Sequence, residues 1–445
     1  MSRTVRGRPD HIIVFARYPA PGRTKTRLIP VLGRLGAADL CRRLTEKTLA
    51  TARCAAEKRR AGLEVCHDGG GLKRMRRWLG RDLLFTAQVE GGLGERMEAA
   101  MDRAFADGCG LVLLLGTDIP DVEPAHLGKA FEHLEDHDLV LGPSLDGGYW
   151  LIGLKRRADV FGGIVWGRAD VLEKTLAKAR EKSLSVRLLA QLSDVDTLDD
   201  LAAWRPEEAA TRPYLSVVIP ALNEAGRVAR TIDSARDPEA EILVVNGGSR
   251  DDTAGEAARA GAKVLSASRG RARQQNLGAS AARGAVLLFL HADTRLPAGY
   301  AGLIFEALLD PGVMLGAFSF KTDLAGGAGR GIEALVNFRS KILRLPYGDQ
   351  GLFLRKTVFA SAGGFPDTPL AEDFLLVRRL KKQGRIVTLA APAVTSGRRW
   401  QNLGLLRTTL VNQIVLAGLY AGLKPATLAR FRQRPGLGSR LQGRA

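Results

Sequence analysis

The stretch Ala285-Val-Leu-Leu-Phe-Leu-His-Ala-Asp293-Thr294 decides the fold expected for this chain of 445 residues. Its six consecutive apolar residues, 285–290, are too few to span a membrane and are typical of a strand buried on both faces of a parallel sheet. The apolar run stops at His291, and Asp293 follows. Ligands of open α/β sheets bind at the carboxyl ends of strands, where a carboxylate can hold Mg²⁺ or Mn²⁺ against a diphosphate. The alternative is that Asp293 caps the next helix.

Strand-like and helix-like patterns alternate on both sides of this stretch. Such alternation is typical of βαβ units in a mainly parallel sheet, so it predicts two consecutive Rossmann-like α/β domains. The predicted strands are residues 11–16, 84–88, 111–116 and 138–142 in the first domain, and 215–220, 241–245, 262–265 and 285–290 in the second, with helices over 37–56 and 93–105 and a further helix from about Asn223.

The boundary between the two domains is predicted where this alternation lapses. Residues 206–213 form a polar segment that begins and ends with a proline, as is typical of a linker. We therefore expect a first domain over residues 1–205, a second over 214–425 and a basic tail over 426–445.

Charge and cysteine usage limit the classes of function. The net charge is +19, and residues 374–445 contain fourteen Lys and Arg but no Asp or Glu. Such a surface attracts anions, which include nucleotide diphosphates and anionic lipid. We do not expect nucleic-acid binding, because the basic block has few aromatic residues and no known binding motif. Four cysteines without a CxxC pair indicate buried thiols in a reducing compartment, and we expect a cytoplasmic protein.

Four ordered motifs carry a resemblance over residues 214–400. They are Val-Val-Ile-Pro-Ala-Leu-Asn-Glu224, Glu-Ile-Leu-Val-Val-Asn-Gly-Gly-Ser-Arg-Asp251, His-Ala-Asp293 and Ala-Glu-Asp373. Together they resemble glycosyltransferase family 2, most closely the bacterial subgroup described as arsenosugar-biosynthesis or selenodomain-associated transferases. The resemblance implies a GT-A-like domain, which binds a nucleoside diphosphate sugar.

The resemblance also implies roles for individual residues. Asp373 would be the catalytic base of an inverting transfer, and Asp293 would bind the metal ion. His291 stands where the family usually has a second acid, and imidazole suits Mn²⁺ better than Mg²⁺. It would be a metal ligand, a residue beside one, or a polar residue with partners inside the protein. The remaining donor-binding candidates are Pro220, Asn223, Glu224, Asn246, Gly248, Arg271, Arg399 and Trp400.

Two of these donor-binding motifs depart from the family pattern. Asn246 replaces an Asp, and we expect an altered base preference because an amide still accepts and donates hydrogen bonds. The glycines after it are also explained by a plain turn. Ser396-Gly-Arg-Arg399-Trp400 resembles the Gln-x-x-Arg-Trp motif of processive members, with Ser in place of Gln, so a polymerising synthase is not expected.

The first domain has its own set of motifs. A turn rich in Gly and Pro after the first strand contains Gly22, Lys25 and Arg27, and could cradle a triphosphate. Acids follow in Gly116-Thr-Asp118, Asp146-Gly147-Gly148-Tyr149 and Asp194-Val-Asp196. These motifs resemble a bacterial nucleotidyltransferase-like family related to 2-phospho-L-lactate guanylyltransferase. The resemblance implies metal ligands at Asp118 and Asp196 and nucleotide contacts at the glycines and basic residues.

We therefore expect a metal-dependent inverting glycosyltransferase fused to a nucleotidyltransferase-like domain that activates a donor or serves as a scaffold. The alternative is that only the first domain is active and the second is a degenerate nucleotide-binding module. The apolar residues 403–423 predict a helix that closes the second domain's core or lies on an anionic membrane surface, which would make the enzyme peripheral at the inner membrane face.

Overall fold

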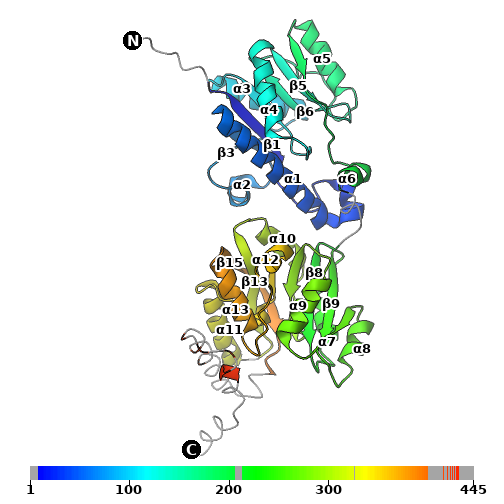
Figure 1. Cartoon of the computed structure of the whole chain (residues 1–445), viewed down its shortest axis with the longest axis vertical. Helices are drawn as coiled ribbons and strands as arrows, with labels where there is room; N and C mark the ends of the chain where they lie inside the picture. Colours follow the sequence, from blue (N-terminus) through cyan, green and yellow to red (C-terminus); the bar gives the residue numbers. More distant parts are fainter. Residues whose placement is uncertain are drawn as a thin grey trace, which may run out of the picture. The chain divides into compact units, whose positions relative to one another are not determined.

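The computed structural model describes residues 9–205, 213–324 and 326–398, with isolated positions between 414 and 429. It divides into two compact units, residues 1–211 and 212–445, and the division falls inside the segment predicted to be a linker (Figure 1). Most of that segment lies outside the described residues.

The N-terminal unit is built on a seven-stranded sheet with the order β3-β2-β1-β4-β6-β5-β7. All neighbouring strands are parallel except that β6 runs antiparallel to both β4 and β5. The strands are β1 (His11–Arg17), β2 (Gly62–Asp68), β3 (Leu84–Ala87), β4 (Val112–Leu115), β5 (Leu139–Pro143), β6 (Tyr149–Leu154) and β7 (Val186–Leu188). The helices are η1 (Thr26–Leu28), α1 (Ile29–Arg59), α2 (Gly71–Leu79), α3 (Leu93–Ala106), α4 (Pro124–Asp136), α5 (Val171–Glu181) and α6 (Leu198–Trp204).

The C-terminal unit repeats this topology. Its eight-stranded sheet has the order β10-β9-β8-β11-β14-β13-β15-β12, in which the first seven positions follow the same sequence of connections and β12 is added at the edge. The antiparallel strand again occupies the fifth position, where β14 pairs with β11 and β13. The strands are β8 (Leu215–Ala221), β9 (Ala240–Asn246), β10 (Lys263–Ser266), β11 (Val286–Phe289), β12 (Thr294–Arg295), β13 (Val313–Thr322), β14 (Leu352–Arg355) and β15 (Arg385–Thr395).

Helices connect the strands of this second sheet (Figure 1). They are α7 (Val228–Ser234), α8 (Thr253–Arg259), α9 (Arg271–Ala281), α10 (Tyr300–Leu308), α11 (Gly326–Lys341), η3 (Gly348–Gln350), α12 (Lys356–Ser361) and α13 (Glu372–Lys381). The two sheets confirm the predicted fold class, two consecutive GT-A-like α/β domains with mainly parallel strands.

The predicted central strand lies in the interior of its sheet. All four residues of β11 are buried, between β8 on one side and β14 on the other. Phe289 packs against the rings of Phe359 and Phe365, with centroids 5.1 and 4.7 Å away. Helix α9 can approach the sheet because Gly278 has no side chain, since a Cβ there would lie 2.3 Å from Val218. Burial on both faces explains the uninterrupted apolar run.

The second unit differs in detail from the sequence prediction. The helix expected from about Asn223 begins at Val228, because Asn223 has left-handed backbone (φ 55°) and its side-chain oxygen accepts a hydrogen bond from Arg250 N at 2.9 Å. The helix predicted over residues 403–423 lies mostly outside the described residues. Leu428, beyond the expected end of the domain at residue 425, is 4% exposed and belongs to the core of the unit. Across the described part of the chain, no helix combines the length and apolar content needed to cross a bilayer.

Candidate functional site

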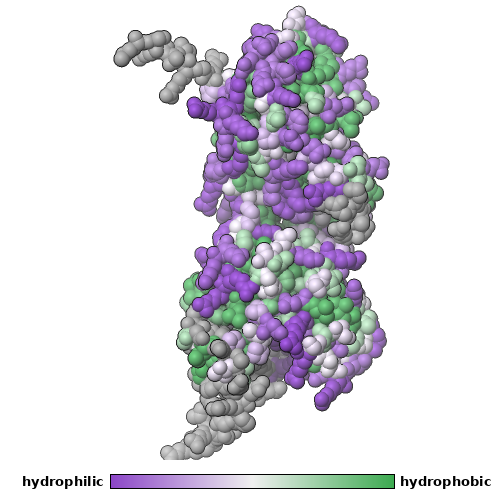
Figure 2. Space-filling model, in the orientation of Figure 1, coloured by the Kyte–Doolittle hydropathy of each residue, from purple (hydrophilic) through white to green (hydrophobic). Residues whose placement is uncertain are grey.

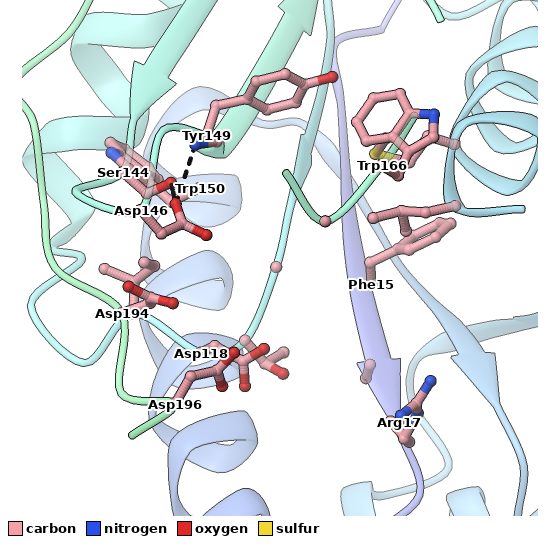
Figure 3. Close-up of a pocket in the computed structure, with 18 of the residues that line it drawn as sticks. Phe15, Arg17, Asp118, Ser144, Asp146, Tyr149, Trp150, Trp166, Asp194 and Asp196 are labelled. Atoms are coloured by element: carbon pink, nitrogen blue, oxygen red, sulfur yellow. Dashed lines mark hydrogen bonds between the residues drawn. The ribbon is translucent and has the colours of Figure 1, made fainter. Parts of the chain in front are cut away.

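A cavity of about 590 Å³ lies at the carboxyl ends of β1 and β4 in the N-terminal unit. Figure 3 shows acidic side chains on one side of it and Phe15, Trp166 and Arg17 on the other. The acids come from three different loops, after β4, β5 and β7, so the fold gathers residues that are far apart in sequence. Those acids are Asp118, Asp146, Asp194 and Asp196.

Lys25 is held among these acids. Its side chain is only 5% exposed, and its ammonium nitrogen lies 2.5 Å from Asp118 and 2.7 Å from Asp196. The same nitrogen donates a hydrogen bond to the carbonyl oxygen of Val195 at 2.7 Å. Because an ammonium group has three donors, all three are used inside the protein. Lys25 therefore draws two carboxylates onto one positive charge, and direct contact with a phosphate would require it to release one of these partners.

The other two acids lie close to this group. Asp146 accepts hydrogen bonds from the Ser144 hydroxyl and, at 3.0 Å, from Gly148 N (Figure 3). Burial and the neighbouring carboxylates of Asp146 and Asp196 raise the pKa of Asp194 to about 6. On this side of the pocket the four acids outnumber the single ammonium charge of Lys25, which favours a bound cation there, whereas arginines line other parts of the cavity.

The structure separates the predicted nucleotide contacts of this unit into two groups. Lys25, Arg27 and Gly148 line the cavity, together with both predicted metal ligands. Gly22 and Gly147 are not among the lining residues. Gly147 has left-handed backbone (φ 86°), and a Cβ there would lie 2.0 Å from the carbonyl oxygen of Ala169, so its glycine is required by backbone packing.

In the C-terminal unit, acids again gather at the carboxyl edge of the sheet. Glu224 follows β8 and forms an ion pair with Arg398, whose guanidinium also lies 3.5 Å from Asp293 after β11. Burial, together with the nearby Glu224 charge, raises the pKa of Asp293. Arg398 is a site residue that the sequence motifs did not identify. The only signal for it was its place one residue before the Arg399-Trp400 pair, which lies outside the described residues.

The loops after β8 and β9 hold each other in place. The side-chain oxygen of Asn246 accepts hydrogen bonds from Ser249 N at 3.0 Å and from the Ser249 hydroxyl at 2.7 Å. That hydroxyl lies 3.0 Å from Asn223 N and accepts its hydrogen bond. Gly248 has left-handed backbone (φ 86°), as the turn requires. An asparagine can therefore replace the usual aspartate here without losing the turn, because only an acceptor oxygen is used.

Pro220 and Arg271 occupy different surroundings. Pro220 is half-buried within β8, where it is paired with Val245 of β9. Arg271 begins α9 and is 3.4 Å from the carboxylate of the buried Glu372. Burial and the adjacent Asp373 raise the pKa of Glu372. Arg271 therefore lies near the predicted base Asp373, because it contacts Glu372, the residue directly before that base.

Asp373 is the second residue of α13, and backbone N–H groups fix both of its carboxylate oxygens. One oxygen accepts a hydrogen bond from Gly348 N at 2.8 Å and the other from Phe374 N at 2.7 Å. His291 also lies against the same glycine: a Cβ on Gly348 would lie 2.7 Å from His291 Nε2 and 3.4 Å from the Asp373 carboxylate. The structure thus brings the histidine of the predicted metal motif close to the predicted base.

Within the described residues, no group of three or more His, Cys, Asp or Glu side chains forms a ready-made metal cage. This is compatible with Mg²⁺ or Mn²⁺ bound jointly by protein and substrate, because such ions are commonly held by one or two carboxylates, water and the phosphates of a ligand.

Comparison with known families divides the chain as the fold does. Residues 50–168 match DUF2064, a family described as an uncharacterised protein conserved in bacteria, and residues 216–353 match glycosyl transferase family 2. A comparison with curated proteins gives no match.

Several solved structures are similar to parts of the chain. A protein provisionally named nucleotide-diphospho-sugar transferase, from Desulfovibrio desulfuricans G20, is 40% identical over 44% of this chain and 87% of its own, with a TM-score of 0.42. The mannosyltransferase PcManGT from Pyrobaculum calidifontis is 20% identical over 41% of this chain and 56% of its own (TM-score 0.34). Glucosyl-3-phosphoglycerate synthase from Mycobacterium tuberculosis is 21% identical over 51% and 85% (TM-score 0.37).

The family matches agree with the resemblance found in the motifs. Each match falls within one of the two compact units, and each unit has the sheet topology described above. The chain therefore carries a match to DUF2064 in its first unit and a match to glycosyl transferase family 2 in its second, and the second match supports a glycosyltransferase.

Proposed function

We propose that the C-terminal unit is a metal-dependent, inverting glycosyltransferase that uses a nucleoside diphosphate sugar. The observation that carries the proposal is the position of Asp373. Its carboxylate is fixed by two backbone N–H groups, and Gly348 brings it close to the loop that contains His291 and Asp293. A base and a candidate metal ligand therefore share one edge of the sheet, where ligands of such folds bind.

Asp293 and Glu224 fit a divalent cation that is shared with a diphosphate. Their carboxylates lie around the guanidinium of Arg398, so they already converge on a positive charge. A bound Mg²⁺ or Mn²⁺ would neutralise charge on the leaving diphosphate. Arg398 is placed to bind a phosphate oxygen once it releases an acid, since guanidinium groups pair well with phosphate.

Asp373 would act on the acceptor. In an inverting transfer the acceptor hydroxyl attacks the anomeric carbon, the bond from that carbon to the diphosphate oxygen breaks, and the hydroxyl proton passes to a carboxylate oxygen. Asp373 would receive this proton. Because both of its oxygens already accept backbone hydrogen bonds, the carboxylate is oriented before the acceptor arrives.

Substitution of Asp373 by Asn tests this role. We expect glycosyl transfer to fall by ~10²–10⁴-fold, because the amide keeps the size of the side chain but is not a base. Donor binding measured by calorimetry should remain. Asp367→Asn is the matched control, since this exposed carboxylate bonds Arg273 on the surface. Loss of donor affinity in Asp373→Asn would show that Asp373 serves binding or structure.

Asp293→Ala tests the metal site in the same assay. We expect the donor to bind the variant equally weakly with and without Mn²⁺, whereas the wild type should bind it more tightly with the ion. Unchanged metal-dependent affinity in the variant would remove Asp293 from the site.

For the N-terminal unit we propose nucleoside triphosphate binding and nucleotidyl transfer. The supporting observation is the cavity that combines four acids with Lys25 on one side and Arg17 with aromatic side chains on the other. Such a pocket has groups for a metal ion, for phosphates and for a base. A thermal-shift screen of triphosphates with Mn²⁺ and Mg²⁺ tests it, with Asp118→Asn as the variant expected to lose the shift. If no triphosphate shifts the melting temperature of the wild type, the unit serves as a scaffold.

A further inference from the structure

The end of α11 exposes an apolar surface. Leu335 is 48% exposed, Phe338 57%, Ile342 64% and Leu343 46%. The first three are spaced by three and four residues, so they lie along one side of the helix and its continuation. Large apolar side chains that are exposed next to one another mark an interaction surface more often than scattered ones do. We refer to these four residues as the α11 face.

Basic side chains border the α11 face. Lys341, Arg344 and Lys381 are exposed, and Lys381 of α13 donates a hydrogen bond to the carbonyl oxygen of Leu343 at 2.8 Å, so α13 touches the face. A hollow of about 390 Å³ lies where the two elements meet, lined by Ile342, Leu343, Arg344, Leu345 and Lys381. Between Glu333 and Asp349 the sequence contains no acid, and Glu333 accepts a hydrogen bond from Thr322 N.

The same elements lead from the α11 face to the proposed base. Helix α13 begins next to Asp373 and ends at Lys381, a rise of about 12 Å between the two residues. The segment after Leu343 reaches Gly348, whose N–H donates to Asp373, within five residues. The face and the catalytic carboxylate are therefore joined by one helix and one short segment.

We propose that the α11 face docks on an anionic lipid surface and that the acceptor of the sugar is an amphipathic molecule held in that surface. The second part rests on the proposed function, because the acceptor hydroxyl must reach Asp373. Apolar side chains enter the interface between headgroups and acyl chains, and surrounding Lys and Arg are attracted to anionic headgroups. The positive charge around the α11 face is complementary to an anionic lipid surface. A second copy of this chain would bring the same cations together.

Vesicle sedimentation of the full-length protein tests the docking. We expect the wild type to sediment with phosphatidylglycerol-containing vesicles at about 0.1 M salt and to do so less at about 0.5 M, where charges are more strongly screened. Phe338→Ser combined with Ile342→Ser should lower the bound fraction at least roughly tenfold. The matched control is Leu277→Ser with Leu303→Ser, which removes two exposed leucines of α9 and α10 and should bind as the wild type does.

Three results would overturn the docking proposal. The first is failure of the wild type to sediment with the vesicles, and the second is equal vesicle binding by the wild type and the Phe338/Ile342 variant. The third is a wild-type dimer that the variant no longer forms, because the α11 face would then be a contact between two copies of the chain. Binding of the nucleoside diphosphate sugar in lipid-free solution reports separately on the proposed function. Both the variant and the wild type should keep it. If the wild type does not bind the donor, the proposed glycosyltransferase mechanism is refuted, and the vesicle result is unaffected.

Acceptor delivery is tested by transfer assays with and without vesicles. If the acceptor is membrane-borne, lipid extract incorporated in vesicles should take up labelled sugar from the donor. The Phe338/Ile342 variant should lose this transfer while it still binds the donor. Equal transfer by both proteins would refute a membrane-borne acceptor.

Discussion

Replacement of Gly348 by Ala should disturb the base without removing any functional group. Gly348 is buried, and its backbone is not in the left-handed region, so alanine is conformationally allowed. Its methyl carbon, however, would lie 2.7 Å from His291 Nε2 and 3.4 Å from the Asp373 carboxylate. These side chains, or the segment around residue 348, must retreat by about 0.5 Å, and overpacking of this kind costs ~1–3 kcal/mol.

Two measurements follow from this geometry. The free energy of unfolding should fall by that amount, which lowers the melting temperature by roughly 2–4 °C per kcal/mol for a unit of this size. Glycosyl transfer should fall by up to ~10²-fold, because a misplacement of about 1 Å can cost that much. Donor binding should change less than the rate.

Gly302→Ala is the control. A Cβ at Gly302 meets nothing within 4 Å, and the residue lies inside α10, so alanine should raise stability by ~0.5–1 kcal/mol. If Gly348→Ala matches the wild type in both stability and transfer rate, contact between this backbone and the two side chains is not what orients the base.

Two further predictions concern buried charges of the N-terminal unit. Burial opposes ionisation of Glu64, but hydrogen bonds from His11 and Thr86 and the Arg103 charge hold its pKa below the usual value. Glu64→Gln should therefore lower the free energy of unfolding at pH 7 by ~1–3 kcal/mol. The difference between variant and wild type should shrink as the pH falls below 4.5, because protonation of Glu64 removes the wild type's advantage. An equal difference at pH 7 and pH 3 would contradict this role of the Glu64 charge. Lys25→Met leaves Asp118 and Asp196 without their shared cation, so added Mn²⁺ should raise the melting temperature of the variant more than that of the wild type. Equal increases in the two proteins would contradict the role of Lys25 as the counter-ion of these carboxylates.

The sequence was sufficient for the alternation of strands and helices and for eight of the fifteen strands of the described residues, β1, β3, β4, β5 and β8–β11. Buried parallel strands read as continuous apolar runs, and the acid after each run lies at the carboxyl edge, as at Asp118 and Asp293. The antiparallel strands were not foreseen. Whether a strand such as β14 is parallel or antiparallel to β11 depends on how the connecting chain returns to the sheet. The residues of the strand itself do not predict that direction.

Side-chain partners were less predictable than positions. Lys25 follows the first strand as a phosphate-binding residue would, yet its ammonium group is enclosed by acids that come from loops about a hundred residues or more away. Arg398, which was not among the predicted site residues, lies between Glu224 and Asp293. The direction of consecutive side chains after β15 is set by backbone geometry, which a motif does not specify.

The acids proposed to bind a divalent ion in each unit have a basic side chain between them, Lys25 in one and Arg398 in the other. Each site therefore has an internal counter-ion, and like charges are not left to repel one another in the resting protein. Chelators should consequently stop turnover without unfolding the chain, and metal uptake should be coupled to arrival of the nucleotide, whose phosphates compensate the displaced cation. The enzyme would then remain folded and ready through periods of metal scarcity.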